Sequence, residues 1–264
     1  MKVILRIALI LSSILLQYCN LTEVEYENGW TKGKSMTAAN DSSVPDSLKI
    51  LLREDAARMA LRDVHSDPES RQSVIILPQE LVDFYYNGLV HIYNSISLPA
   101  RDTVFVVYKI HTIRRPETHS VIVAVDSTKS WVQKWRLGQR LTGNPQIDAL
   151  MINYDLQLIN YYDWSFLHAV VLESPKPINI YALAKRFLPI DGVLFAEENY
   201  TVGDGDDVNA VIEQEYLTVE FSKGWDDCFA GCISRRYWVF QVKFNGLVRF
   251  MRSYGNILPK AVML

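Results

Sequence analysis

The spacing of apolar residues changes near residue 103, and this change constrains the fold more than any other feature of the sequence. Before it, apolar side chains recur at helical spacing over residues 46–64 and 78–93. After it, apolar and polar residues alternate with a period of two, which is typical of strands. Helices followed by hairpin-linked strands predict an α+β fold: two N-terminal helices, then a mainly antiparallel sheet with short helices.

Local signals set the expected limits of the helices. The first helix should stop before Pro68, because the residue before a proline disfavours the helical conformation. Pro78 should open the second helix, since proline is favoured in a first helical turn. Two shorter helices are predicted, each preceded by an asparagine that can cap it: 145–155 after Asn144 and 180–188 after Asn179.

Several stretches rich in alternating β-branched residues predict strands. A hairpin through residues 113–117 would join the first two, and the Asn245-Gly246 pair would turn the last one. The predicted strands cover 103–111, 119–125, 168–173, 193–197, 208–222, 237–244 and 247–251.

The N-terminus has the pattern of an export signal. Lys2 and Arg6 precede an apolar run over residues 7–16, which is too short to span a bilayer as a stable anchor. We therefore predict a signal peptide over residues 1–18 and export out of the cytoplasm.

The segment Leu16-Gln17-Tyr18-Cys19 resembles the lipobox of bacterial lipoproteins, although Tyr18 departs from its small residue before the cysteine. The resemblance implies that Cys19 is lipidated and anchors the protein to a membrane of the cell envelope. An ordinary signal peptide, giving a periplasmic or secreted protein, is the alternative. Residues 19–45 lack any sustained period and are predicted to be a flexible tether.

The remaining chain, residues 46–264, is long enough for one α+β body or for two subdomains, 46–165 and 166–264. The charge of the full 264-residue chain is nearly balanced: 27 Lys and Arg against 30 Asp and Glu give a net charge of −3. This balance provides no electrostatic footprint for nucleic acid, so a protein, peptide or glycan partner is expected instead.

Two further cysteines, Cys228 and Cys232, lie four residues apart. In an exported chain this spacing is most simply a local disulfide, whereas a redox pair or a metal site are the alternatives. Charged and aromatic residues surround the pair and suggest a contact surface. The candidate residues of this surface are Trp225, Asp226, Asp227, Arg235, Arg236 and Trp238.

The same segment, residues 224–240, is similar to a Gly-Trp-x-Asp-Cys-x-x-Gly-Cys-Ile signature of uncharacterised exported proteins of the Bacteroidota type. The resemblance implies export and carries no activity with it.

An acidic turn offers a weak candidate site for Ca²⁺. The candidate ligands are Asp204, Asp206, Asp207 and Glu215: an EF-hand loop that starts at Asp204 would place Glu215 at the required position 12, but it has Val208 at ligand position 5. Asn209 stands where that loop requires glycine, so an exposed acidic turn is the alternative interpretation. We predict no other metal site and no cofactor.

Residues 179–200 resemble the helix–strand unit of propeptide-like inhibitor domains of subtilisin-type proteases, from Asn179-Ile-Tyr-Ala-Leu-Ala through Gly192-Val193 to Ala196-Glu197. Those domains are small α/β sandwiches with an antiparallel sheet, so the resemblance implies such a fold and, more weakly, protease inhibition.

The chain contains neither a G-x-S-x-G nor an H-E-x-x-H motif, and no catalytic residue is predicted. The sequence therefore favours a binding or scaffolding role over an enzyme. A protease-inhibitor module and a hydrolase of envelope glycan or peptide with an unrecognised site are the alternatives.

Overall fold

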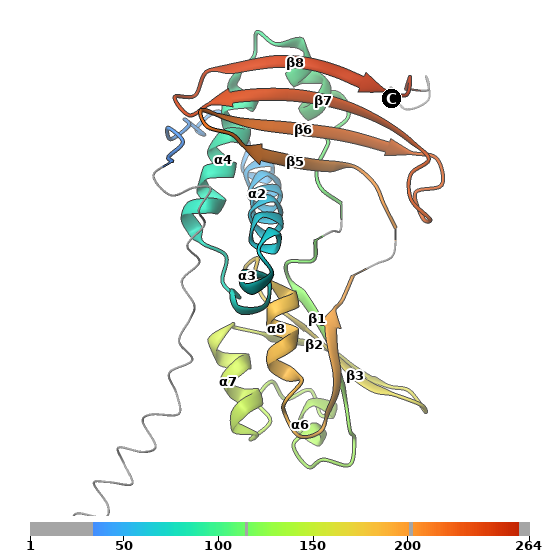
Figure 1. Ribbon diagram of the computed structural model, residues 1–264. Coiled ribbons are helices and arrows are strands. Elements are labelled where there is room, and N and C mark those ends of the chain that lie inside the picture. Colours follow the sequence, from blue (N-terminus) through green and yellow to red (C-terminus); the bar gives the residue numbers. More distant parts are fainter. Residues whose placement is uncertain (1–33, 114–115, 201–202, 259–264) are drawn as a thin grey trace, which may run out of the picture.

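The computed structural model describes residues 34–113, 116–200 and 203–258 (Figure 1). It confirms the α+β class, with two separate four-stranded antiparallel sheets in place of one.

The helices are α2 (Asp46–Ser66), α3 (Pro68–Ser73), α4 (Gln79–Asn94), α5 (Pro99–Asp102), the π-helix η1 (Thr103–Val107), α6 (Val132–Arg136), α7 (Pro145–Asn153) and α8 (Ile180–Phe187). The strands are β1 (Ser120–Val125), β2 (Gln157–Asp163), β3 (His168–Glu173), β4 (Val193–Glu198), β5 (Asp207–Ile212), β6 (Tyr216–Trp225), β7 (Ser234–Lys243) and β8 (Val248–Gly255).

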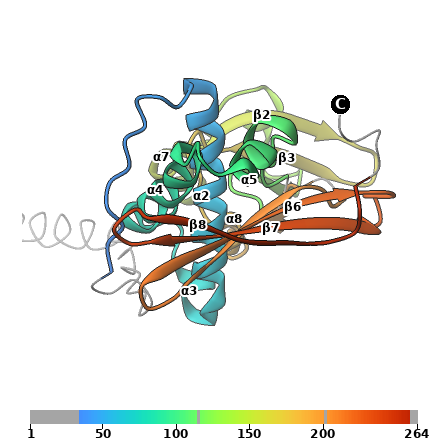
Figure 2. The same cartoon turned by 90° about the horizontal axis from the view of Figure 1, so that it is seen from above.

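The first half of the molecule, which we call the helix–sheet lobe, combines residues 34–113 with residues 203–258. Its sheet has the order β5-β6-β7-β8, and Figure 1 shows α2 and α4 on one side of it. From above, α2 runs across the direction of the strands (Figure 2). Leu89, Phe221 and Phe240 are fully buried in the core between helices and sheet. This core forms only when two distant parts of the sequence meet.

The second half, which we call the βαββαβ lobe, comprises residues 116–200. Its sheet has the order β2-β3-β1-β4, and every neighbouring pair is antiparallel. With α6 and α7 between β1 and β2, and α8 between β3 and β4, this is the split βαβ arrangement of ferredoxin-like folds. All three helices lie on the same face of the sheet, because they contribute side chains to one apolar core. These core side chains are Val132, Trp135, Ile147, Leu150, Leu183 and Phe187.

The predicted caps form as expected. The Asn144 side chain accepts hydrogen bonds from the backbone N–H groups of Gln146 and Ile147, and that of Asn179 accepts one from Ala182. The short helix α3 was not predicted, although Asp67-Pro68 carries the same cap-and-proline signal as Asn144-Pro145.

The predicted strand over residues 103–111 is wrong. Pro99 opens a helical turn, α5, which continues as η1 through the β-branched run. Val104 and Phe105 are both buried, and Phe105 packs edge-on against Phe221 at 5.3 Å between ring centroids. A strand with one buried face would expose one of two neighbouring residues, whereas a helix can bury both. Packing against residues 203–258 therefore overrides the β-propensity of this run. The predicted hairpin is therefore absent, and β1 pairs with β3 and β4 instead.

The two lobes divide the chain differently from the sequence-based subdomains. The boundary between residues 165 and 166 falls within the β2–β3 hairpin, where Tyr162 pairs with Ala169. The βαββαβ lobe is instead an insertion between the two parts of the helix–sheet lobe.

The predicted signal peptide and Cys19 lie outside the described residues. The described part of the predicted tether, from Lys34, packs on the helix–sheet lobe. Met36 and Val44 are buried there, and the Thr37 N–H donates to the carbonyl of Phe244.

Candidate functional site

The predicted contact surface centres on the turn between β6 and β7. The disulfide between Cys228 and Cys232 is present and closes this turn, which confirms the predicted bond. Asp226 and Asp227 have positive φ values of 60° and 41°, a conformation that Asp tolerates better than most residues. We call residues 226–233 the disulfide loop.

The disulfide loop exposes apolar side chains. Phe229 is 76% and Ile233 is 75% exposed, and Asp226 and Asp227 are exposed beside them. Sequence reasoning had not singled out Phe229 or Ile233, although both belong to the exported-protein signature segment. Exposed apolar residues on a constrained loop are typical of a recognition surface.

Asp204 holds the base of the loop. Its Oδ2 accepts hydrogen bonds from Nη2 of Arg235 at 2.6 Å and from the N–H of Cys232 at 3.1 Å, while its own N–H donates to the carbonyl of Cys228 at 2.6 Å. Burial raises the pKa of Asp204, but the hydrogen bond from Arg235, those from the backbone and the guanidinium charge outweigh it and hold the pKa below 3.8. The carboxylate therefore stays ionised and fixes the loop to the strand end.

Close packing beneath the loop requires a glycine. A Cβ atom at Gly224 would lie 2.5 Å from Sγ of Cys232 and 2.9 Å from the carbonyl oxygen of Gly205. The disulfide sulfur of Cys232 therefore packs directly on the backbone of β6 at Gly224, and this contact restricts the movement of the loop.

Of the other residues predicted for the contact surface, only some lie close to the disulfide loop. Trp225 ends β6 at the loop, whereas Arg236 turns to β8, where it donates to Ser253 and to the carbonyl of Gly255. Including Trp238 was wrong: it is 6% exposed and packs against Tyr108 in the core. Its position on β7 places it opposite Phe221, on the buried face of the sheet.

The predicted calcium ligands do not converge. Asp206 pairs with Lys223 at 2.8 Å, and Asp207 pairs with Arg62 at 2.7 Å. Glu215 lies in the β5–β6 turn, at the other end of that hairpin from Asp204. Within the ranges that the structure describes, no group of three or more His, Cys, Asp or Glu side chains is placed to hold a metal ion.

Two connected grooves lie where the lobes meet. The larger, of about 980 Å³, runs between residues 73–80 and 174–178, which are joined by an antiparallel bridge from Ile76 to Ile178. Its wall includes Lys176 and Arg186. Sequence reasoning missed this site, because its walls come from segments a hundred residues apart.

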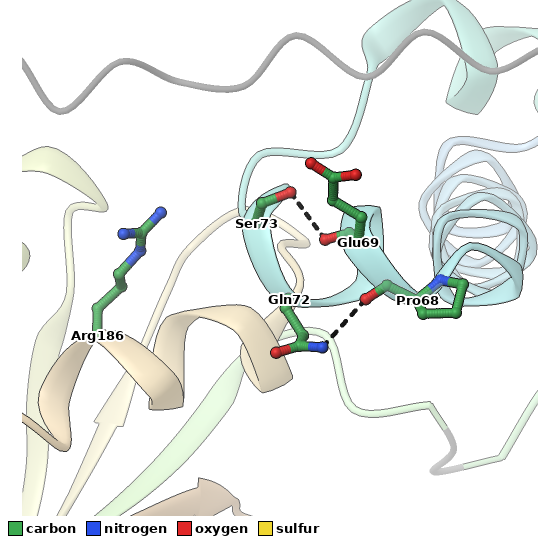
Figure 3. Close-up of a pocket in the computed structure, with 5 residues that line it drawn as sticks. All are labelled: Pro68, Glu69, Gln72, Ser73 and Arg186. Atoms are coloured by element: carbon green, nitrogen blue, oxygen red, sulfur yellow. Dashed lines mark hydrogen bonds between the residues drawn. The ribbon is translucent and has the colours of Figure 1, made fainter.

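The smaller groove, of about 540 Å³, lies between α3 and α8 (Figure 3). Ser73 and Gln72 donate to backbone carbonyls of their own helix, while Arg186 reaches in from α8. Within the described part of the chain, Arg186 and Lys176 have no carboxylate partner. The groove walls therefore carry cations together with the carboxylates of Glu69, Glu80 and Asp155.

A hydrogen-bonded pair of titratable side chains ties the lobes together near these grooves. Nε2 of His119, before β1, lies 3.0 Å from both carboxylate oxygens of Glu54 on α2. The hydrogen bond to Glu54 raises the pKa of His119 against the effect of burial. Burial raises the pKa of Glu54, but His119 and Arg58 outweigh it and the net pKa is lowered. This pair lines neither groove, so it does not supply the acid and base that the predicted hydrolase would need there.

Comparison with known proteins does not classify the chain: no family model, no curated protein and no solved structure matches it significantly. Among the helices described, none combines the length and apolar character needed to cross a membrane.

Proposed function

We propose that this protein is exported to the bacterial cell envelope, is anchored there by a lipid on Cys19, and acts by binding a partner rather than by catalysis. The observation that carries the binding role is the disulfide loop, which presents Phe229 and Ile233 to solvent on a base fixed by Asp204. A constrained apolar loop loses little conformational entropy on binding, which favours recognition of a protein, peptide or glycan.

The disulfide also supports export. Such bonds persist in oxidising compartments and are rare in a reducing cytosol. The lipobox-like segment at Cys19 and the exported-protein signature add to this support, and both remain sequence predictions.

A photo-crosslinking experiment tests the binding role. A crosslinking phenylalanine analogue in place of Phe229 should give a discrete adduct in intact cells. The same analogue in place of Val211, which is exposed on β5, serves as the control and should give none. Adducts from both positions, or from neither, would contradict the proposed contact surface.

Intact mass of the membrane-extracted protein tests export and anchoring. We expect loss of residues 1–18, the added mass of a lipid on Cys19, and two hydrogens fewer than the reduced chain. Full-length protein with Met1 retained and two free thiols would contradict both.

The topology of the βαββαβ lobe favours one second candidate, a protease-inhibitor module. The resemblance of residues 179–200 implies a small α/β sandwich with an antiparallel sheet, and α8 and β4 lie in a lobe of that kind. The purified protein would then inhibit a subtilisin-type protease at micromolar concentration, and absence of inhibition would remove this candidate.

A further inference from the structure

The face of the βαββαβ sheet opposite α6, α7 and α8 carries a row of aromatic and small side chains. Strand register places Tyr162, Ala169, Ala124 and Phe195 opposite one another on β2, β3, β1 and β4. Directly opposite residues point to the same face, and this face is not the one that holds the helix core. Tyr162 and Phe195 thus stand on the two outer strands of the sheet, and the two alanines between them are fully buried.

The aromatic row continues beyond the sheet. The rings of Tyr162 and Trp164 are stacked with centroids 4.6 Å apart, and those of Trp164 and Phe166 with centroids 6.0 Å apart. The two residues of the hairpin turn, 165 and 166, follow Trp164, whose N–H donates to the carbonyl of Leu167. Trp164 is 39% and Phe166 is 83% exposed. We call Tyr162, Trp164, Phe166 and Phe195 the aromatic face.

The charged residues that the strand register places on this face are both glutamates, while Arg136 of α6 pairs with Asp163 at the end of β2. None of the four strands, nor the β2–β3 turn, contains a lysine or an arginine. Glu197 lies opposite Ile122, and Glu173 opposite Ser120, so both carboxylates share this face. Over the residues that the structure describes, neither glutamate forms an ion pair.

We propose that the aromatic face binds an extended peptide segment of a partner protein that presents apolar and basic side chains on the same side. Exposed aromatic residues supply most of the energy at protein interfaces, and they would bury the partner's apolar side chains. Glu173 and Glu197 would pair with its lysines or arginines, because opposite charges across an interface select the partner and its register. This surface is separate from the disulfide loop, which lies on the other lobe.

Other occupants fit this surface less well. An anionic lipid surface would be repelled by Glu173 and Glu197, and a second copy would set the same carboxylates against each other.

Fluorescence anisotropy with two labelled synthetic peptides tests the proposal. One peptide of about ten residues repeats Leu-Leu-Lys-Lys, so that each side of the extended chain carries both residue types, and the other repeats Leu-Leu-Glu-Glu. We expect only the leucine–lysine peptide to bind, with a Kd in the micromolar range. The double variant Trp164→Ser, Phe166→Ser should weaken binding about tenfold or more. The variant Glu173→Gln, Glu197→Gln should also weaken it and reduce its dependence on salt.

Matched controls separate this surface from the rest of the molecule. Tyr254→Ser changes an exposed aromatic residue on the outer face of the other sheet, and it should leave peptide binding unchanged. Phe229→Ser, in the disulfide loop, should also leave it unchanged, so that this proposal and the proposed function fail separately. Circular dichroism checks that each variant is folded.

Several outcomes would overturn the proposal. These are no binding of the leucine–lysine peptide, equal binding of the leucine–glutamate peptide, or unchanged binding by both double variants. Binding to phosphatidylglycerol vesicles that is lost in the Trp164→Ser, Phe166→Ser variant would assign the face to a membrane instead. Self-association that is lost in the same variant would assign it to a second copy of the chain.

Discussion

The two sheets have the same number of strands and the same antiparallel pairing, but their outer faces differ in chemistry. On the sheet of β5–β8, the Tyr254 hydroxyl donates to Glu220 at 2.6 Å, and Arg252 lies over the Tyr254 ring. The hydrogen bond to Glu220, together with burial, raises the pKa of Tyr254 to about 12. On the βαββαβ sheet, Tyr162, Trp164 and Phe166 form a longer stack, and Glu173 and Glu197 have no ion-pair partner among the described residues. On the first face, the polar group of Tyr254 is hydrogen-bonded to Glu220. The second face instead carries exposed aromatic side chains and two glutamates that a partner could contact.

The lobes that carry these sheets are also assembled differently. The βαββαβ lobe uses one continuous stretch of chain, and its core forms a cluster distinct from that of the helix–sheet lobe, from which it takes in Ile75. The helix–sheet lobe needs the two ends of the described chain to meet. The junction between them holds the Glu54–His119 pair and the Ile76–Ile178 bridge.

Core truncations should have the largest effects and should show whether the cores are independent. Phe221→Ala and Trp135→Ala each remove a fully buried ring, so each should cost about 3–5 kcal/mol of unfolding free energy. Hydrogen exchange should accelerate in β5–β8 for the first variant and in β1–β4 for the second. Uniform acceleration through both sheets in either variant would mean that the lobes unfold as one unit.

Removal of the disulfide should have a smaller effect, confined to one lobe. The β6–β7 turn is cross-linked, whereas the β2–β3 turn is not. Closing a loop of five residues stabilises by about 2 kcal/mol through the entropy of the unfolded chain, so Cys228→Ser should lower stability in urea by about that amount. The double variant with Cys232→Ser should match the reduced wild-type protein. A loss as large as that of a core truncation would show that the whole sheet depends on the bond.

The pair that joins the lobes should make stability depend on pH. The raised pKa of His119 means that its contribution is complete below 6.5 and is lost as pH rises through the folded-state pKa. The lowered pKa of Glu54 means that its contribution is complete above 4.5 and is lost as pH falls through the folded-state pKa. The destabilisation caused by His119→Asn should therefore be greatest between pH 4.5 and 6.5.

The size of this effect should be about 1 kcal/mol or less, since the pair is partly exposed. Thermal unfolding across this pH range measures the loss of stability. Glu54→Gln should show the same dependence of that loss on pH as His119→Asn. A difference between wild type and His119→Asn that is constant from pH 4 to 9 would contradict the ion pair.

The smallest stability effects are expected on the two outer faces, where function should distinguish them. Trp164→Ser and Tyr254→Ser should each change the unfolding free energy by only about 0.5 kcal/mol, as is usual at exposed positions. Trp164→Ser should reduce the fluorescence of a bound apolar dye more than Tyr254→Ser does, because Trp164 lies in a stack of three rings, whereas Tyr254 stacks on Tyr237 alone. Equal reductions by both variants would remove the contrast between the faces.

Part of the candidate site was predictable. The disulfide followed from two cysteines four residues apart, and the aromatic face has a local signal, because Tyr162, Trp164 and Phe166 alternate with a period of two. The burial of Trp238 was not predictable, because it depends on Tyr108 packing against it from a distant part of the chain. The grooves between the lobes were also not predictable, because no local sequence pattern shows that residues 73–80 meet residues 174–178.

By itself, the sequence determined the features that arise within a few residues: the asparagine caps of α7 and α8, the turn at Asn245-Gly246 and the disulfide loop. Only the tertiary structure decided that residues 103–107 become helical, that β1 lies between β3 and β4, and that the sheets turn different outer faces to solvent. The physical reason is that caps and turns are stabilised by neighbouring backbone groups. Strand order and burial depend instead on apolar contacts between residues far apart in the chain, and no local pattern records those contacts.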